Sequence, residues 1–435
     1  MSAVTQTLVG AQSDPYDSSR YRYYALGLMT AGYTLSFLDR QILAILQEPI
    51  KSEFGLTDGQ LGLLTGFTFA LFYVVLGLPI ARWADRGVRR DIMALAIGIW
   101  SVMTALCGLA QHYLHLLLAR VGVGIGEAGG SPPAYSMVSD IFPPRQRATA
   151  LGVYSIGVNL GILAGFLIGG WVNQLFGWRV AFLAAGIPGI LLAVLVRVTV
   201  AEPLRRHSAV QTLGAEEQPP VAEVLRQLWS YRTFRHMVWG ASLMSFAGYS
   251  TFNWLPSLLI RTHGLSTGTI GTWLAMSIGI GGAVGTIGGS YLADRLGQRD
   301  KRWYAWITVL GYTIAMPLLI GTLLAANGRT ALLCFVVPGS VLAMCTPALI
   351  AVTHSLVGNR MRALSAAVVL FVLNVFGLGL GPLAVGVLSD HLTPAYGIDG
   401  LRYAMLMLVT PAAAWGMIHF LLAARHIKAE WTAAN

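Results

Sequence analysis

Long apolar runs alternate with short polar breaks along the whole chain. Each run continues for about 20–28 residues before Gly, Pro or charged residues end it, and such a helix crosses the ~30 Å core of a bilayer. A bilayer offers the backbone no hydrogen-bond partners, so the runs are predicted to be helices of an all-α integral membrane protein. Twelve spans are expected in two sets of six, at 22–47, 58–82, 91–111, 113–138, 146–171 and 179–199, then at 234–260, 267–293, 303–326, 330–356, 363–389 and 401–424.

The composition agrees with a lipid environment. Hydrophobic residues make up 55% of the chain and charged residues only 11%, against roughly 25% charged residues in soluble domains. Cys107, Cys334 and Cys345 lie inside apolar runs without C-x-x-C spacing, so we expect neither disulfide nor metal chemistry. The net charge of +10 is dispersed between apolar segments, which does not favour nucleic-acid binding.

The positive charges predict the topology of the spans. Twelve spans place both termini on one side of the membrane. Most of the 29 Lys and Arg residues fall in the loops on that side, whereas the opposite loops hold Lys51, Arg179, Arg261, Arg329 and Arg402. The positive-inside rule therefore predicts that both termini are cytoplasmic.

The same breaks divide the chain into five regions. We expect a disordered cytoplasmic tail at 1–20, a six-helix bundle at 21–200, a cytoplasmic linker at 201–233, a second bundle at 234–425 and a tail at 426–435. The first tail lacks the basic-then-apolar order of a signal peptide. Apolar residues recur at helical spacing in the linker, which predicts either an amphipathic helix on the membrane face or a simple connector. These residues are Val221, Val224, Leu225, Leu228 and Trp229.

Two short loops repeat between the halves: ADRGVRRD at 84–91 and ADRLGQRD at 293–300. A repeat at about half the chain length indicates duplicated transporter halves. An aspartate at a helix end can bind arginines of the other bundle and hold the cytoplasmic side shut, although such charges could also serve topology alone. The candidate gate residues are Asp85, Arg86, Arg89, Asp294 and Arg295.

These loops resemble the G-x-L-A-D-R-x-G-R-R signature of the major facilitator superfamily. The resemblance implies two pseudo-symmetric bundles of six transmembrane helices. The first copy departs from the signature, since Ala81 replaces the leading Gly and Gly87-Val88 inverts the x-G order. The second copy has Ser290 at the leading position and Gln298 in the basic run.

Four further segments are similar to bacterial members of the Spinster family within that superfamily. They are LDRQ at 38–41, EPIKSEFGL at 48–56, GLPIAR at 77–82 and GIGEA at 124–128. Relatives in the family are implicated in exporting sphingosine-1-phosphate and lysophospholipids, so the resemblance implies a lipid-like amphiphile as the substrate. It also implies that Asp39 is linked to proton coupling, and it matches Arg120 to the arginine of the family's R-x-x-x-G-x-G motif.

Four charged residues fall inside predicted spans: Asp39 and Arg40 in the first, Arg120 and Glu127 in the fourth. A bare charge at mid-bilayer costs ~2.5–3.5 kcal/mol on insertion scales, so each needs a partner or a function. Helical rise places Asp39 and Arg120 ~10–12 Å from the same outer surface, where they can meet. Glu127 follows Arg120 by two turns on the same face, which predicts an acid-base ladder that loads and releases protons. The alternative is a static ion network that fixes helix packing.

The fourth and fifth predicted spans are rich in glycine. The run Gly122-x-Gly124-x-Gly126 follows no strand, so nucleotide binding is not expected, and residues 129–133 should kink or unwind the fourth span. A stripe on the fifth span resembles the antiporter motif G-x-x-x-G-P-x-x-G-G, with Phe166 at the proline position. It predicts close helix packing or a role in transport direction. The stripe consists of Gly157, Gly161, Gly165, Gly169 and Gly170.

The second half carries no Asp, Glu, Lys or Arg in mid-span. Tyr249, Asn253 and Asn374 are its candidate polar contacts, so we expect a charged wall facing an apolar, aromatic wall. The candidate substrate-binding residues are Arg40, Arg120, Tyr249, Asn253 and Asn374, and the candidate proton carriers are Asp39 and Glu127.

These features predict secondary active transport, in which a proton drives an anionic, lipid-like amphiphile by alternating access. A sugar-acid or other organic-anion symporter is the first alternative, and a passive lipid scramblase or non-transporting receptor is the second. We expect no enzyme and no cofactor, because Walker, G-x-S-x-G and His-rich metal motifs are missing from the sequence. A monomer in a bacterial inner membrane is expected.

Overall fold

The computed structural model describes residues 15–204, 220–341, 344–358 and 361–434, and its first half holds six rods of membrane length. A 3-10 turn, η1 (Pro15–Asp17), precedes them. The rods are α1 (Ser19–Phe54); α2 (Asp58–Gly62), η2 (Leu63–Phe67) and α3 (Thr68–Arg86); α4 (Arg89–Cys107); α5 (Tyr113–Glu127) and α6 (Ser131–Ile141); α7 (Pro144–Phe176); and α8 (Trp178–Thr199).

The second half repeats this plan after a short helix, α10 (Val221–Ser230). Its rods are α11 (Arg232–His263); α12 (Thr267–Leu274), η3 (Ala275–Ile280) and α13 (Gly281–Gly297); α14 (Trp303–Leu324); α15 (Gly328–Val341) and α16 (Cys345–Leu356); α17 (Arg362–Leu373), η5 (Asn374–Leu380) and α18 (Gly381–Tyr396); and, after η6 (Gly397–Asp399), α19 (Gly400–Ala434).

Eight stretches of the described chain are long and apolar enough to span a membrane. One of them, residues 364–432, runs through two rods. The other three rods fall short for reasons visible in the sequence: α1 carries charges, α5 and α6 are separated by a turn, and α11 has several basic residues. The rods thus confirm the expected fold of twelve transmembrane helices.

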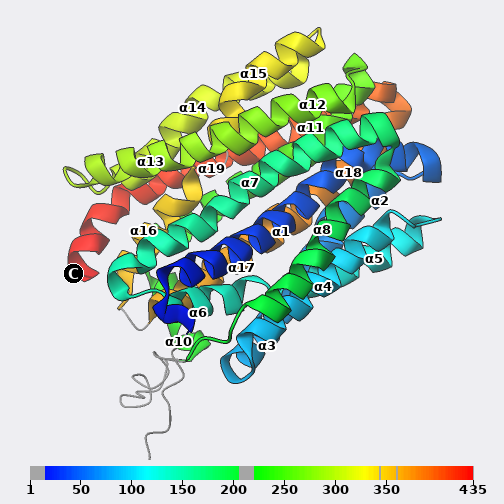
Figure 1. Ribbon diagram of the computed structural model, residues 1–435. Helices are drawn as coiled ribbons and strands as arrows, with labels where there is room; N and C mark the ends of the chain where they lie inside the picture. The colour runs from blue at the N-terminus through cyan, green and yellow to red at the C-terminus, as the bar shows by residue number, and fades with distance from the viewer. Residues whose placement is uncertain (1–14, 205–219, 342–343, 359–360, 435) are drawn as a thin grey trace, which may run out of the picture.

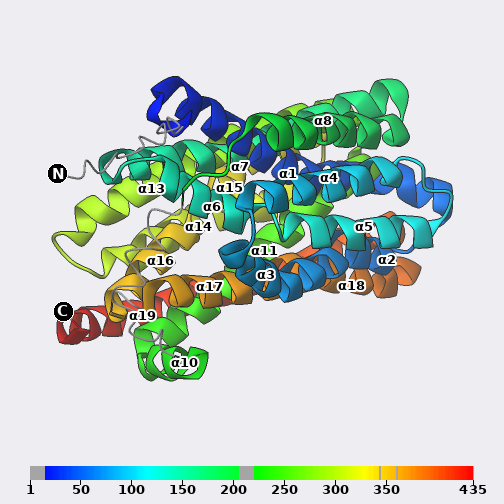
Figure 2. The same cartoon turned by 60° about the horizontal axis from the view of Figure 1, so that its bottom comes forward.

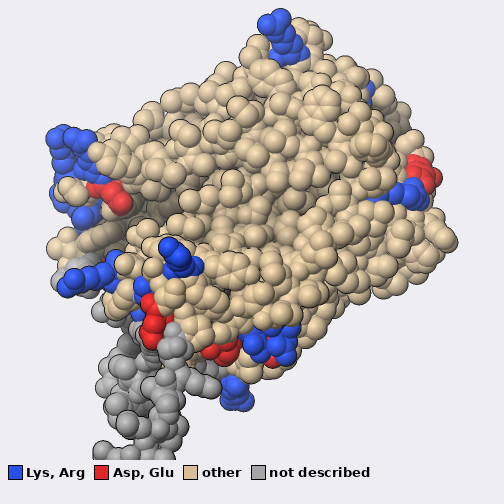
Figure 3. Space-filling model, viewed as in Figure 1, with Lys and Arg blue, Asp and Glu red and all other residues tan. Residues whose placement is uncertain are grey.

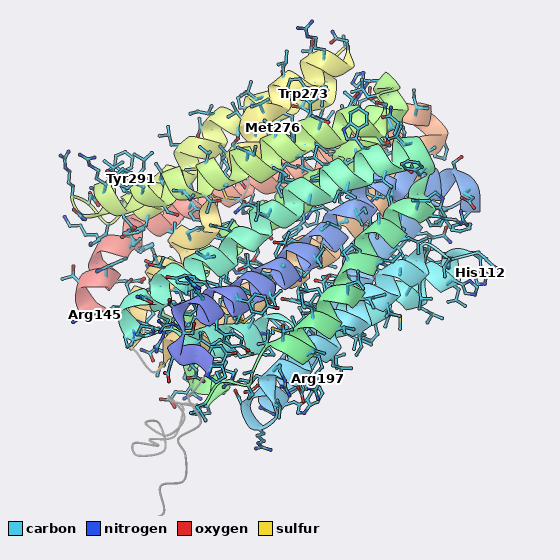
Figure 4. The ribbon with its side chains drawn as sticks, in the orientation of Figure 1. His112, Arg145, Arg197, Trp273, Met276 and Tyr291 are labelled. Carbon is cyan, nitrogen blue, oxygen red and sulfur yellow. The ribbon has the colours of Figure 1, made fainter. Side chains whose placement is uncertain are left out.

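The rods run roughly parallel, with the start of α1 and the end of α19 at the same end of the bundle (Figures 1 and 2). We call this the terminal end and the opposite one the far end. On the face seen in Figure 3, acidic and basic side chains gather at the two ends, and a broad band without them lies between. Figure 4 places Arg145, Arg197 and Tyr291 toward the terminal end and His112 at the far end.

The surface of the band is apolar, as a lipid-facing surface must be. Leu191 is 67% exposed, Val198 76% and Ile287 71%. Met276, on η3, is 55% exposed and points outward beside Trp273 in Figure 4. A soluble protein would not leave so many large apolar side chains uncovered on one surface.

The glycine stripe of α7 serves close packing. A Cβ atom on Gly165 would lie 2.8 Å from Gln41 Cβ and the Leu38 carbonyl oxygen of α1, and one on Gly169 would lie 2.9 Å from Ile42. Gly170 meets α12 of the second half in the same way, close to the Thr267 carbonyl. The missing side chains therefore let α7 contact both halves at short distance.

The predicted tails contain more structure than expected. Residues 1–14 and the acidic, Pro-rich segment 205–219 lie outside the described residues, but Tyr16 is buried and its hydroxyl donates to the Ala201 carbonyl at 2.5 Å. At the other terminus α19 continues through 426–434, because Glu430 accepts hydrogen bonds at 2.9 Å from the amides that begin α11 and Trp431 stacks on Tyr304.

The linker helix α10 has two apolar faces. Val224 and Leu228 are fully buried, whereas Val221, Leu225 and Trp229 are 42–50% exposed. The buried face packs on α11 and α17 at the terminal end.

Candidate functional site

Asp39 of α1 and Arg120 of α5 form a buried ion pair at the level that helical rise predicts. Arg120 Nη1 donates to Asp39 Oδ2 at 3.0 Å, and the two side chains are 2% and 3% exposed. The Arg120 guanidinium also lies 5.5 Å from the ring centre of Phe69. The pair joins the first and fourth spans in the interior of the first half.

A second pair joins the same two helices. Arg40 Nε and Nη2 both lie 2.7 Å from Glu127 Oε2, and Ser36 Oγ donates to the same oxygen at 2.8 Å. The expected ladder therefore has two crossed rungs, because each arginine binds the acid of the other helix. Glu127 is fully covered, while the Arg40 side chain keeps 11% exposure.

Aromatic rings enclose the Arg40 guanidinium. Phe37, Phe69 and Tyr73 have their ring centres 4.7, 4.9 and 4.8 Å from its central carbon. Such cation–π contacts attract the arginine without using the carboxylate, by ~0.5–2 kcal/mol each. The rings therefore stabilise the position of Arg40 in addition to the ion pair with Glu127.

Three atoms of the two pairs have no partner. Asp39 Oδ1, Glu127 Oε1 and Arg120 Nε are buried and unbonded among the described residues. Buried polar groups are nearly always satisfied, so each unsatisfied atom calls for a reason. A site whose acids change protonation state supplies one, since a protonated carboxyl needs a different set of partners from a carboxylate.

Glycines and a helix break create this geometry. A Cβ on Gly124 would lie 3.0 Å from the Phe69 carbonyl, and one on Gly126 would lie 2.6 Å from the Trp100 amide nitrogen, so α5 contacts both neighbouring rods closely. α5 ends at Glu127 and α6 begins at Ser131, which confirms the expected interruption below Glu127.

A tyrosine cluster surrounds the arginine, and sequence reasoning named only one of its members. Tyr33 stacks on Tyr154 with ring centres 4.5 Å apart, and Tyr135 meets Tyr154 edge-on at 5.1 Å. Tyr249, the predicted member, comes from the second half and lies within the electrostatic range of Arg40. Most of the aromatic wall thus belongs to the first half, which corrects the expectation that the second half supplies it. No regular spacing links these residues, which lie on separate spans.

The two predicted asparagines bond to groups outside this cluster. Asn374 Nδ2 donates to the Leu370 carbonyl of its own helix at 2.8 Å. Asn253 Oδ1 accepts from Gln47 Nε2 and, at 3.1 Å, from Thr65 Oγ1, so it joins the halves toward the far end.

A far-end network closes the halves against each other. Arg261 of α11 binds Glu48 Oε1 and both oxygens of Asp58 at 2.6–2.9 Å. Ser389 donates to Asp58 at 2.6 Å, and the Asp390 carboxylate accepts from the amides of Asp58 and Gly59 at 2.8 and 2.7 Å. The sequence pattern predicts Arg261 only as a topology charge, because its partners are more than 200 residues away.

The predicted gate residues lie at the terminal end. Asp85 and Arg86 are exposed in the last turn of α3, and Asp294 accepts from Tyr304 at 3.0 Å within the second half. Arg295 donates to Tyr291 of its own helix at 3.0 Å.

Arg89 does not have the contacts expected of a gate residue that bridges the two bundles. It is 2% exposed and binds Asp140 at 2.5 Å and Glu202 at 2.8 Å, both in its own half. These two acids occupy its guanidinium, so in this structure Arg89 braces α4, α6 and the chain after α8 instead of bridging the bundles.

Comparisons with known proteins agree with this architecture. The family model described as "Major Facilitator Superfamily" matches residues 29–382. An "MFS-type efflux pump" from Mycolicibacterium smegmatis is 36% identical over 418 residues, covering 94% of each chain. A "D-galactonate transporter" from Escherichia coli is 25% identical over 437 residues, covering 94% of this chain and 97% of its own.

A solved structure resembles the chain over nearly its whole length. It is described as a bacterial homolog of the human lysosomal transporter Spinster in an inward-facing, unoccupied conformation. The TM-score is 0.81 at 30% sequence identity, covering 95% of this chain and 98% of that one. The twelve rods, the repeated loops and these matches lead to one conclusion: the chain belongs to the major facilitator superfamily of membrane transporters and resembles its bacterial Spinster members.

Proposed function

We propose that the protein couples proton movement to the transport of an amphiphilic anion, with Asp39 and Glu127 as proton carriers. The observation that carries the proposal is the pair of crossed acid–arginine bridges inside the first half. Ion pairs that served packing alone could be replaced by apolar residues at no loss, whereas these retain unsatisfied buried atoms.

Glu127 and Arg40 link the proton to the anion. When Glu127 takes up a proton it loses its charge, and Arg40 is left with only its aromatic neighbours. The freed guanidinium, the more exposed of the two arginines, then binds an anionic group of the substrate. Coupling is reciprocal, so bound anion also favours the protonated state of Glu127. Anion binding should therefore strengthen as the pH falls.

Asp39 and Arg120 form the second ion pair through which a proton can control an arginine, and this pair is more deeply buried than the first. Their pair is almost fully buried, so its separation needs either a proton on Asp39 or a rearrangement of α1 against α5. We assign Asp39 to proton coupling and Arg120 to control of Asp39, with substrate contact in other conformations. Rocking of the halves about this site completes alternating access.

The surroundings favour a substrate with an anionic head and an apolar or unsaturated body. Apart from the Glu127 carboxylate, the neighbours of Arg40 include the rings of Phe37 and Tyr73, which suit an apolar or unsaturated body. A lysophospholipid or sphingosine-phosphate type molecule has this chemistry. The distribution of positive charge supports a bacterial inner membrane with the terminal end in the cytoplasm. The far-end network then closes the outer side, as in an inward-facing transporter.

A substrate panel at two pH values tests the proposal. Equilibrium binding of lysophosphatidylglycerol, zwitterionic lysophosphatidylcholine and galactonate to the purified wild-type protein is measured at pH values of about 5.5 and 8. These values lie about 1 and 4 units above the ordinary pKa of glutamate. We expect the anionic lysolipid to bind best and more tightly at the lower pH. Glu127→Gln, which mimics the protonated acid, should bind it equally well at both. Binding that is insensitive to pH in the wild type would contradict the coupling.

A small organic anion is the second candidate substrate. It is favoured by the nearly full-length similarity to a D-galactonate transporter. Galactonate binding in preference to lysophosphatidylglycerol would support it, with the same proton chemistry. A passive scramblase would move lipids without a response to the proton gradient.

A further inference from the structure

A small cavity lies beside Glu127, and Arg40 is not among the residues that line it. Its space for the centre of a water-sized sphere is about 10 Å³, roughly the minimum that holds one water molecule. α1, α4, α5, α6 and α7 all contribute to its wall. The polar groups that line it are Tyr33, Ser36, Trp100, Glu127, Ser131 and Tyr154.

The two oxygens of Glu127 face different surroundings. Oε2 accepts hydrogen bonds from Ser36 Oγ and Arg40 Nε, and Arg40 Nη2 forms an ion pair with it at 2.7 Å. Oε1 is buried without a partner, and Glu127 lines the cavity. A proton that approached through Oε2 would have to displace Arg40 first. Oε1 is therefore the oxygen that a proton can reach while the ion pair is intact.

Hydroxyl groups continue from the cavity toward the surface. Ser131 lies beside Tyr154, and both residues line the cavity. Tyr154 is 2% exposed, but the ring of Tyr135 beside it is 40% exposed. Ser131 and Tyr135 belong to α6, which continues toward the terminal end of the bundle.

The break between α5 and α6 brings a hydroxyl group close to Glu127. Since α5 ends at Glu127 and α6 restarts at Ser131, the Ser131 side chain falls one turn beyond the carboxylate, at the edge of the turn. The other charged and titratable groups near Glu127 are Asp39, Arg40 and Tyr33 of α1 and Tyr154 of α7. The cavity residues of α4 are Met93, Ile97 and Trp100, none of which titrates.

We propose that this cavity binds one water molecule that joins Glu127 Oε1 to the hydroxyls of Ser131 and Tyr154. The water relays the proton between Glu127 and the terminal-end surface, because a proton can pass through one bridging water as through a direct hydrogen bond. The proton then reaches Glu127 through Oε1, whereas the substrate acts on Oε2 through Arg40. The inference rests on the proposed role of Glu127 as a proton carrier.

Infrared spectroscopy after a pH jump tests the relay without any substrate. The full-length protein is reconstituted in lipid, and the carboxylic C=O band of Glu127 is identified by its loss in Glu127→Gln. The rate at which this band appears after acidification is then compared among variants. Ser131→Ala and Tyr154→Phe remove hydroxyls, and Ala134→Val fills part of the cavity. Ser139→Ala, on the same helix with its hydroxyl bonded to the Tyr135 carbonyl, is the matched control.

We expect each of the three cavity variants to slow the appearance of the band about tenfold, while Ser139→Ala keeps the wild-type rate. If one variant fails to fold, the other two still test the relay. A band that appears at the wild-type rate in the folded cavity variants would overturn the relay and leave the role of Glu127 intact. A Glu127 that shows no such band at any pH would overturn both the relay and the proton role proposed for this residue.

Discussion

The two halves of the molecule share a helical plan but carry unequal chemistry. The first half contains two buried ion pairs in mid-span, each with unsatisfied atoms. In the second half, Arg261 lies near the far end of its helix and pairs with acids of the first half. Asn374 satisfies its amide within its own helix. The two halves therefore share the packing of six rods, whereas the costly mid-span ion pairs seen among the described residues lie in the first half.

The difference assigns different tasks to the halves. In the proposed mechanism the first half carries the protons, and its own aromatic rings enclose Arg40. The second half adds Tyr249 to that site and supplies Arg261, Ser389 and Asp390 to the far-end network. In the proposed alternating-access cycle, the second half is the wall that moves against the site of the first half.

The strongest test of this division removes Arg40, the more exposed arginine of the two ion pairs. Arg40→Ala should weaken binding of lysophosphatidylglycerol about a hundredfold, because a charge-assisted contact in a desolvated site is lost. Arg40→Lys, which keeps the charge but lacks the planar fork, should recover only part of the affinity. Equilibrium binding on folded protein measures both. Unchanged affinity in Arg40→Ala would place the anion elsewhere.

A smaller effect is expected from the far-end network. Arg261→Ala leaves Asp58 and Glu48 without their common partner, so the closed far end is destabilised. A cysteine at Ser257, in a variant without the three native cysteines, should react about tenfold faster with a reagent added from the outside. Arg329→Ala removes an exposed arginine on the same side and should leave the rate unchanged. Equal rates in both variants would show that the network does not hold this end shut.

Tyr249→Phe should have a modest effect. The substitution removes one hydroxyl from the site and keeps the ring, so lysophosphatidylglycerol binding should weaken about threefold to tenfold. Phe252→Leu, on the same helix, is a control outside the tyrosine cluster. A loss as large as that in Arg40→Ala would mean that the second half contributes more to recognition than the comparison of halves implies.

The smallest effect is expected at Asn374. Its amide bonds to its own helix, so Asn374→Ala should change substrate affinity less than about twofold. A large loss of affinity, measured by the same binding assay, would restore the original prediction that Asn374 contacts the substrate.

The sequence predicted the rods and one ion pair because both depend on local rules. Apolar run length determines the spans, and helical rise was enough to bring Asp39 and Arg120 to one depth. The pairing of Arg40 with Glu127 depends on how α1 and α5 are rotated against each other, which one-dimensional spacing does not contain. The aromatic cluster likewise forms from separate spans, without a motif.

Arg89 and Asn253 show that a sequence pattern does not identify the partner of a polar residue. A signature loop suggested that Arg89 bridges the bundles, but its partners are Asp140 and Glu202, which are 51 and 113 residues away. Asn253 looked like a ligand for substrate, yet it contacts Gln47 and Thr65 of the other half. A polar residue in a span indicates that some partner exists, and only the fold shows which one.

The central claim, that the first half holds the proton coupling, is tested most directly by transport in proteoliposomes. Lysophosphatidylglycerol movement under a pH gradient is measured for the wild type, Asp39→Asn and Asp399→Asn. Asp399 is the control because it is a second-half acid that pairs with Arg402 at the far end. We predict that Asp39→Asn is folded but has lost transport driven by the gradient, while Asp399→Asn behaves like the wild type. Undiminished pH-driven transport by Asp39→Asn would contradict the account.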